Sequence, residues 1–331
     1  MNTHEASPVL DLIESFRRSK TMFSALRLGV FDRLAEGPTH AAALAAGGSV
    51  DAMERLLDAC VSLGLLAREG EIYSNTPMAA RYLSRKSPDT LAGYISYSDQ
   101  VLYPLWGALE DAVREGTHRW KQVFGLEGPL FSHFFETEGK KQDFLLGMHG
   151  FGRLSSPAIV RAFDLSGFRR LVDLGGATGH LAMAASEAWP NLRAAVFDLP
   201  GVIETARQFV AGSAVELIAG DFFSDPLPQA DLYSLGRILH DWSEDKIERL
   251  LENIHRCLPL GGAVLIAEKL LDEDLCGPVH GHMQSLSMLV CTEGKERSFS
   301  QYADLLGRAG FGEVEGKRTG TPLDAILARK K

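Results

Sequence analysis

The sequence predicts an α/β fold in which a parallel sheet with helices on both faces follows a largely helical region. Three observations predict it. From Arg170 onward, short apolar runs alternate with helical patterns, which is typical of a parallel sheet. Before Arg170, apolar residues recur at helical spacings of three or four. The 331 residues are enough for two domains with a large buried core.

The composition narrows the class of protein. Hydrophobic residues make up 45% and charged residues 23%, which is ordinary for a globular chain. The formal net charge of −9 argues against a nucleic-acid partner, because such proteins need basic faces for phosphates. The four cysteines form no Cys-x-x-Cys pair, and the sequence shows neither a secretory start nor an apolar stretch that could span a bilayer. We expect a cytoplasmic protein with reduced thiols and no contact with a membrane.

The first 100 residues predict helices followed by a small wing. Apolar spacing predicts two helices over 9–36, and an alanine-rich helix follows Pro38. The next helix carries Met53 and Leu57 on its apolar face, and 65–73 predicts two short strands around a glycine turn. Winged helices of this kind often bind DNA, but this one is more acidic than basic. We therefore expect an interaction module.

Helices are expected again over 77–163, with many aromatic residues. Phe131, Phe135 and Met148 fall on the last helices before the glycine-rich segment, where they could line a pocket. Packing in the core is the alternative for these side chains.

From residue 170 the elements follow in alternation. We expect strands over 171–174, 192–197, 215–219, 232–239 and 263–267, helices over 178–189, 201–210, 243–258, 279–291 and 300–309, and closing strands over 311–317 and 323–328. The helix after Ser243 has the clearest signals. Ser243 is a predicted N-cap, and apolar residues from Ile247 to Leu258 form one stripe.

The first predicted strand ends in an acid and breaks into glycines, as Asp173-Leu174-Gly175-Gly176-Ala177-Thr178-Gly179. A dinucleotide fingerprint would require glycines where Ala177 and His180 stand. The pattern acid-x-Gly-x-Gly-x-Gly fits better, with Ala177 in place of the middle glycine. It resembles motif I of S-adenosylmethionine-dependent methyltransferases, although glycine turns also occur for structural reasons.

The next three strands also end in polar residues. Asp198 lies 19 residues beyond Gly179, a spacing that suits a carboxylate on ribose hydroxyls. Asp221 and Phe222 could bond and stack on a purine, although Asp221 alone could simply start a turn. Because ligands collect at the carboxyl ends of parallel strands, four such ends in succession predict a ligand site.

Taken together, the motifs Phe-Asp-Leu-Pro, Gly-Asp-Phe-Phe, Leu-His-Asp-Trp and Glu-Gly-Lys-Glu-Arg resemble the class I small-molecule O-methyltransferases. The most similar type is the acetylserotonin O-methyltransferase-like branch, and the resemblance covers nearly the whole chain. It implies a Rossmann-like class I methyltransferase domain, a parallel sheet with an antiparallel terminal strand, over 166–331. It also implies an all-helical winged-helix domain over 1–100 that builds a homodimer, and a helical connector over 101–165 that lines the substrate pocket.

The resemblance also implies roles for individual residues. Asp173 of motif I, together with further residues at the strand ends, would surround S-adenosylmethionine: Gly175, Asp198, Leu199, Asp221, Phe222 and Arg237. His240 would be the general base, flanked by Glu268 and Glu296 and supported by Asp241. Met288 would pack against the acceptor. Ser287 stands where the acetylserotonin enzyme has an asparagine, which puts that substrate in doubt.

The chemistry of methyl transfer agrees with a histidine at this place. Transfer from a sulfonium requires alignment of donor and acceptor and removal of the acceptor's proton. Moving a proton from a phenol of pKa about 10 to a histidine near 6.5 is uphill by roughly 5 kcal/mol, and an aliphatic hydroxyl would cost more than twice as much. We therefore expect a phenolic or heteroaromatic small-molecule acceptor. No metal is expected, because His280 and His282 would point different ways on a helix.

Two other functions remain open from the sequence. The same fold and cofactor could serve a different acceptor, such as the sulfur of a small thioether acid. Alternatively, the chain could be a winged-helix regulator that binds the cofactor as a signal.

Overall fold

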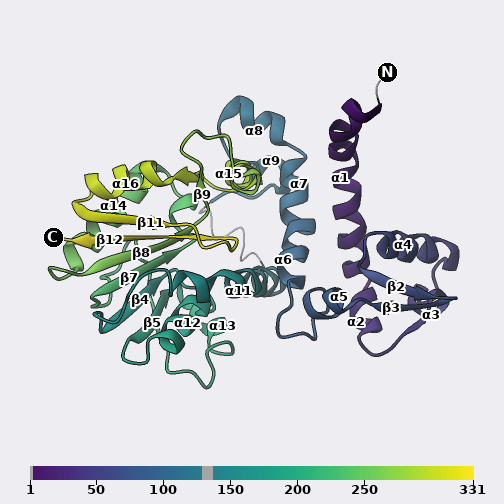
Figure 1. Cartoon of the computed structure of the whole chain (residues 1–331), viewed down its shortest axis with the longest axis horizontal. Helices are drawn as coiled ribbons and strands as arrows, with labels where there is room; N and C mark the ends of the chain where they lie inside the picture. Colours follow the sequence, from purple (N-terminus) through teal and green to yellow (C-terminus); the bar gives the residue numbers. More distant parts are fainter. Residues whose placement is uncertain (1–2, 129–136) are drawn as a thin grey trace. The chain divides into compact units, whose positions relative to one another are not determined.

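The computed structural model describes residues 3–128 and 137–331. The chain divides into two compact units, Met1–Val101 and Leu102–Lys331, called here the N-terminal and the C-terminal unit. Most of the segment 101–165, expected as a connector, therefore belongs to the C-terminal unit (Figure 1). Within the described residues, no helix is both long and apolar enough to cross a membrane.

The N-terminal unit consists of helices around a small sheet. Its elements are α1 (Thr3–Arg27), α2 (Val30–Leu34), β1 (Thr39–His40), α3 (Ala41–Ala45), α4 (Val50–Ser62), β2 (Leu66–Glu69), β3 (Ile72–Asn75), α5 (Pro77–Tyr82) and α6 (Ala92–Tyr97). The two strands of the expected wing pair antiparallel, and the unexpected strand β1 adds to β3. The unit is therefore helical apart from this three-stranded sheet.

One face of α1 stays uncovered within this unit. The C-terminal half of α1 contributes Phe23 and Leu26 to the core, where α4 contributes Met53, Leu57 and Cys60. Large apolar side chains of its N-terminal half are more than half exposed: Val9, Leu10, Leu12, Ile13 and Phe16. An exposed apolar row of this kind is typical of an interaction surface.

The C-terminal unit contains a seven-stranded sheet and the remaining helices. Its strands are β4 (Arg170–Leu174), β5 (Arg193–Asp198), β6 (Glu216–Ala219), β7 (Leu232–Gly236), β8 (Ala263–Glu268), β9 (Leu270–Leu271), β10 (Arg297–Ser298), β11 (Phe311–Lys317) and β12 (Asp324–Lys330). Its helices are α7 (Tyr103–Trp106), α8 (Leu109–Glu115), α9 (Trp120–Phe124), α11 (Glu138–Ile159), α12 (His180–Ala188), α13 (Pro200–Ala206), α14 (Glu244–Cys257), α15 (Val279–Cys291) and α16 (Phe299–Arg308). A π-helical turn, η1 (Ser98–Leu102), precedes α7, and a 3-10 turn, η2 (Leu239–Asp241), follows β7.

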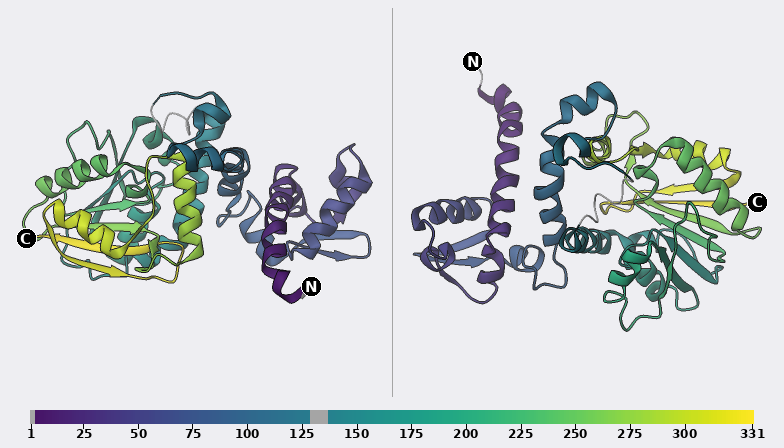
Figure 2. Two further views of the ribbon diagram at one scale, coloured as in Figure 1. Left: turned by 90° about the horizontal axis from the view of Figure 1, so that it is seen from above. Right: turned by 180° about the vertical axis from the view of Figure 1, so that it is seen from behind.

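The large sheet is almost entirely parallel. Its strand order is β11-β12-β8-β7-β4-β5-β6, and β12 alone runs antiparallel to both of its neighbours. Helices α12 and α13 cover one face and α14 and α16 the other (Figure 1), and the two further views in Figure 2 show the sheet between these layers. The predicted parallel sheet with an antiparallel terminal strand is confirmed.

The core of this unit lies between the sheet and its helices. Every residue of β8 is buried, as expected for a central strand covered on both faces. The predicted stripe of α14 is buried against it, with Ile247, Leu250, Leu251 and Ile254 at most 1% exposed. Burying a side chain of this size contributes about 1.5–3 kcal/mol, so these layers hold the strand ends in place.

Some local expectations were wrong. Ser243 is the N-cap residue of α14, as predicted, but its side chain makes no capping hydrogen bond. Strand β7 ends at Gly236 rather than Leu239, because Arg237 has a left-handed φ of 58° and the chain then forms the turn η2. The helix after the glycines begins at His180 rather than Thr178, since Gly179 has a φ of 79°. A periodic apolar pattern does not reveal such single-residue breaks.

Replacing the two serines that precede α14 and α16 tests this difference in capping. Ser298 forms a reciprocal capping box with Gln301, so Ser298→Ala should lower the free energy of unfolding by about 1 kcal/mol. Ser243→Ala should change it by only a few tenths of a kcal/mol, since no cap bond is lost. Urea unfolding followed by tryptophan fluorescence measures both, and equal losses would contradict the assignment of caps.

Candidate active site

The residues singled out from the sequence gather where the parallel strands end. Because β4, β5, β6, β7 and β8 run in the same direction, their carboxyl ends share one edge of the sheet. That edge carries the glycine loop after β4, Asp198 at the end of β5, Asp221 just after β6, His240 just after β7 and Glu268 at the end of β8. In an open sheet this is the edge at which ligands bind.

The glycine loop, residues 175–179, has a backbone that a side chain would obstruct. Gly175 has a φ of 67°, and a Cβ there would lie 2.5 Å from Ile238 Cδ1. Its amide donates to the carbonyl of Phe197 at 2.8 Å, which continues the pairing of β4 with β5. Ala177, which replaces a glycine in the motif, still adopts a left-handed φ of 49°. The loop can therefore bring its backbone close to a ligand.

Asp173 supports this loop from within the sheet. It is 1% exposed, and Ser234 on β7 donates to its Oδ1 at 2.7 Å. Its Oδ2 lies so near Gly176 that a Cβ there would be 2.5 Å away. Burial raises the pKa of Asp173 to about 7, against the hydrogen bond from Ser234. A direct contact of Asp173 with a ligand stays a prediction, whereas its contacts with the loop and β7 are observed.

Asp198 connects the end of β5 to the loop. Its Oδ2 accepts from the amide of Ala177 at 2.9 Å, and its Oδ1 accepts from the amide of Leu199 at 2.7 Å. Burial nevertheless raises the pKa of this carboxyl group to about 6. Each carboxylate oxygen has a second lone pair, so Asp198 can still accept hydrogen bonds from hydroxyl groups of a ligand.

The segment after β6 forms a turn and an aromatic surface. Oδ1 of Asp221 accepts a hydrogen bond from the amide of Phe223 at 2.8 Å. This oxygen therefore stabilises a turn, which is the alternative role considered for Asp221. Phe222 lies against the glycine loop, 3.3 Å from the place of a Cβ on Gly175. Its ring meets that of Phe223 edge to face, with centroids 4.8 Å apart. The site thus has an apolar ring beside a carboxylate.

Arg237 begins the turn that carries the histidine. Its φ of 58° is unusual for a residue other than glycine. Its amide donates to the carbonyl of Ala267 at 3.0 Å, which extends the pairing of β7 with β8. Its guanidinium lies 4.9 Å from the centre of the Phe151 ring on α11. Strained backbone of this kind is often found at functional sites.

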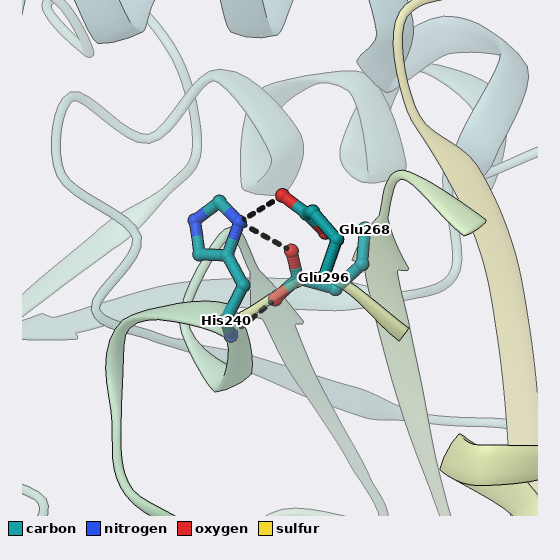
Figure 3. A group of neighbouring side chains, drawn as sticks. All are labelled: His240, Glu268 and Glu296. Carbon is teal, nitrogen blue, oxygen red and sulfur yellow. Dashed lines mark hydrogen bonds and ion pairs between the residues drawn. The ribbon is translucent and has the colours of Figure 1, made fainter. Parts of the chain in front are cut away.

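His240 is held between two glutamates (Figure 3). Its Nδ1 lies 2.6 Å from Glu296 Oε1 and 3.3 Å from Glu268 Oε2. On the other side of the ring, Nε2 is 3.7 Å from Asp241 Oδ1. His240, Glu268 and Glu296 are all at most 2% exposed. The imidazole is therefore fixed at Nδ1, while Nε2 has no bond at hydrogen-bonding distance among the described side chains.

The carboxylate of Glu268 also builds the turn on which His240 sits. Its Oε1 accepts from the amides of Ile238 and Leu239, each at 3.0 Å, and from the amide of His240 at 3.4 Å. The turn packs closely against the chain before β10, because a Cβ on Gly294 would lie 2.2 Å from the carbonyl oxygen of His240. Sequence reasoning placed Glu268 beside the histidine but did not foresee that it holds this backbone.

Burial controls the charges in this cluster. It raises the pKa of Glu268 to about 7, that of Glu296 to about 8 and that of Asp241 to about 6. The positive charge of Arg237 acts in the opposite direction on all three. Because the groups interact strongly, protons leave the cluster as a whole rather than one residue at a time.

The same three side chains could in principle hold a metal ion. Among the described residues, His240, Glu268 and Glu296 are the group of possible ligands whose atoms lie within 4.8 Å of one another. However, Nδ1 of His240 is already bonded to Glu296, and Oε1 of Glu268 already receives backbone amides. By contrast, Oε2 of Glu268 and Oε2 of Glu296 are buried and accept no hydrogen bond from the described residues. That the site uses no metal stays a prediction.

The residues expected to contact an acceptor lie on α11 and α15. Met148 is half-buried on α11, and Met288 is buried on α15. Ser287 is buried beside it and accepts a hydrogen bond at 3.2 Å from the indole nitrogen of Trp106 on α7, a contact that the sequence did not predict. Phe131 and Phe135 lie outside the described residues.

Comparisons with known proteins agree over both units. The model of the O-methyltransferase domain matches residues 106–312, and that of the O-methyltransferase dimerisation domain matches residues 10–85. The chain is 44% identical over 328 residues to the acetylserotonin O-methyltransferase of Macaca mulatta, covering 95% of each. The crystal structure of human N-acetylserotonin methyltransferase in complex with S-adenosylmethionine matches with a TM-score of 0.94 and 41% identity, over 100% of this chain and 98% of that one. The structure of PigF with S-adenosylhomocysteine matches with a TM-score of 0.89 and 30% identity, over 98% and 99%.

The buried cluster makes a prediction about stability and pH. A carboxyl group whose pKa rises on folding stabilises the fold below its unfolded pKa of about 4.5, and this contribution is lost as pH rises through its folded pKa. For Glu296 that folded value is about 8. The parent should therefore lose stability as the pH rises from 5 to 9, and Glu296→Gln should not. The unfolding free energy of Glu296→Gln minus that of the parent should increase by roughly 1–3 kcal/mol over this range.

Denaturant unfolding at both pH values measures this change. Glu293→Gln is the matched control, because Glu293 lies nearby but is partly exposed and paired with Lys246. A difference between Glu296→Gln and parent that stayed constant with pH would show that burial does not raise this pKa.

Proposed function

The chain belongs to the O-methyltransferase family and is an S-adenosylmethionine-dependent methyltransferase; we propose that it methylates a hydroxyl group of a small phenolic or heteroaromatic metabolite, with His240 as general base. The observation that carries the proposal is the imidazole of His240, fixed at Nδ1 by Glu296 and placed at the strand edge beside the glycine loop.

The residues around the loop suit the cofactor. The left-handed backbone at Gly175 and the remaining lone pairs of Asp198 fit a nucleoside whose ribose needs acceptors. Leu199, Asp221 and Phe222 would hold the adenine end, with Phe222 contributing its apolar ring, and Arg237 would lie beside the charged end. Bound S-adenosylmethionine supplies an electrophilic methyl group. The protein's task is then to align an acceptor with it and to take the acceptor's proton.

His240 can take that proton at Nε2. Above the pKa of about 8 that burial gives Glu296, its ionised carboxylate requires a hydrogen on Nδ1, which leaves the lone pair of Nε2 available. When Nε2 gains a proton, the imidazolium lies among Glu296, Glu268 and Asp241, which stabilise its charge. This stabilisation offsets part of the roughly 5 kcal/mol needed to deprotonate a phenol, whereas an aliphatic alcohol would cost more than twice as much.

The acceptor side of the site supports a small planar substrate. Met148 and Met288 would pack against its rings, since methionine side chains adapt to aromatic surfaces. The curated relatives act on acetylserotonin according to their names. In this chain the hydroxyl of Ser287 is engaged by Trp106, so we keep the acceptor at the level of a chemical class.

We also propose that the enzyme is a cytoplasmic homodimer. The dimerisation-domain match and the exposed apolar row of α1, from Val9 to Phe16, support a second copy as the partner. The winged-helix arrangement of the N-terminal unit would then serve dimer assembly rather than DNA binding. None of the four cysteines, all within the described residues, forms a disulfide, which is consistent with a reducing compartment.

Replacing the proposed base separates oxygen from sulfur as the methylated atom. His240→Asn keeps a donor toward Glu296 but has no base at the position of Nε2. Turnover of a hydroxyl acceptor should fall about 10²–10⁴-fold, while the Kd for S-adenosylhomocysteine stays within about twofold. A screen of phenols, hydroxy acids and thioethers by release of S-adenosylhomocysteine identifies the acceptor, and calorimetry measures binding.

His255→Asn is the control, because His255 lies on α14 and its ring packs edge to face against Phe311. Near-parent turnover by His240→Asn would overturn the O-methyltransferase mechanism and favour a thioether, which has no proton to remove. A parent that binds S-adenosylhomocysteine but methylates nothing would favour the regulator.

The dimer proposal predicts that charges on α1 separate the subunits. Leu12→Glu with Phe16→Glu places two carboxylates on neighbouring turns of the exposed apolar row and should shift light scattering from dimer to monomer mass at micromolar concentration. Val113→Glu, at an equally exposed apolar residue of α8, should leave the mass unchanged. A parent that is already monomeric would contradict the proposal.

A further inference from the structure

One face of α11 carries polar groups that the proposed mechanism does not use. His149, Gly152 and Ser156 follow one another at spacings of three and four, so they lie on the same side of the helix. This side packs against α12 (Figure 1), the helix that begins where the glycine loop ends. The three residues thus come from an element outside the sheet edge that carries the remaining site residues.

Two hydrogen bonds join this face to the loop. Nδ1 of His149 lies 2.9 Å from Oγ1 of Thr178, a loop residue that is fully buried. Two residues later, Nδ1 of His180 lies 2.8 Å from Oγ of Ser156. The helix can approach because Gly152 has no side chain, since a Cβ there would be 2.3 Å from the ring of His180.

Both imidazoles are neutral at physiological pH. Burial lowers the pKa of His149 to about 4, and the charge of Arg153 acts in the same direction. Burial lowers the pKa of His180 to about 3, together with the neighbouring His149 and Arg237. A neutral imidazole has one donor and one acceptor nitrogen, so each ring can make its bond without a charge beside the loop.

The contact at Thr178 completes the attachment of the loop. Toward the sheet, the loop is held by Phe197 and Asp198, which bond the amides of Gly175 and Ala177. Toward α11, His149 bonds the side chain next to Gly179, whose left-handed φ of 79° ends the loop. The loop is thus held from two sides, by the end of β5 and by α11.

We propose that His149 is a positioning residue for the cofactor: through Thr178 it holds the glycine loop in the conformation that binds S-adenosylmethionine. The inference rests on the proposed function in one respect, because it takes this loop as the cofactor's site. The competing explanation is packing alone, since the ring of His149 also packs against that of Phe209, with centroids 4.6 Å apart and the planes tilted by 41°.

Four variants separate the two explanations. Thr178→Val removes Oγ1 at constant shape, and His149→Phe keeps an aromatic ring on Phe209 but removes Nδ1. His149→Asn returns a polar nitrogen near the place of Nδ1 and should restore part of the affinity for S-adenosylhomocysteine that His149→Phe loses. Thr205→Val is the matched control, because Thr205 is another buried threonine of this unit whose hydroxyl bonds only within α13, at 3.4 Å from Gly201 O.

Calorimetry with S-adenosylhomocysteine gives the first measurement. Thr178→Val and His149→Phe should each raise its Kd about 3- to 10-fold, and the double variant should be no weaker than the weaker single variant, because both changes break one bond. The loss should appear in KM for S-adenosylmethionine more than in kcat. Thr205→Val should bind like the parent.

Hydrogen exchange of the ligand-free protein gives the second measurement. Amides over 175–179 should exchange faster in both variants than in the parent and the control. If the variants bind like Thr205→Val, or if their effects on Kd add, His149 only packs and the inference is wrong while the proposed function stands. If the parent does not bind S-adenosylhomocysteine, the cofactor assignment fails, and the exchange measurement still decides whether His149 holds the loop.

Discussion

The buried carboxylate of Glu268 is the group on which the geometry of the site depends. One of its oxygens accepts three consecutive amides of the turn after β7, and the other faces Nδ1 of His240. Without an acceptor, these amides would be unsatisfied in a buried place, at a cost of about 1–3 kcal/mol each. The end of β8 thus determines where the residue after β7 presents its imidazole, and Gly294 leaves room for that turn.

This arrangement has an energetic cost. Glu268, Glu296 and Asp241 are taken out of water together, and burial outweighs the charge of Arg237 in the pKa of each. A fold selected for stability alone would place apolar residues there. The layers of α14 and α16 compensate through apolar burial on one face of the sheet, and the acidic cluster lies where the imidazolium of the proposed mechanism would need it.

Much of the fold and of the candidate site could be predicted from the sequence because the signals are local. Strand-ending acids, glycines and the stripe of α14 each lie within a few residues, so the sheet and the sheet-edge residues could be placed. Ser243 shows the limit: it is the N-cap residue of α14, as its type predicts, yet its side chain makes no capping bond. The partners Ser234 for Asp173 and Thr178 for His149 lie 61 and 29 residues away, and no spacing rule connects them.

The difference between local signals and contacts of distant residues also explains why the reaction is easier to infer than the substrate. The cofactor side comes from successive strand ends of one sheet, whose order follows from the topology. The proposed acceptor side comes from α7, α11 and α15, which meet only in the folded chain, as the bond between Trp106 and Ser287 across 181 residues shows. A change at such a position alters the shape offered to an acceptor without touching the loop or His240. Acceptor choice can therefore vary while the proton-accepting geometry stays fixed, because different elements carry the two properties.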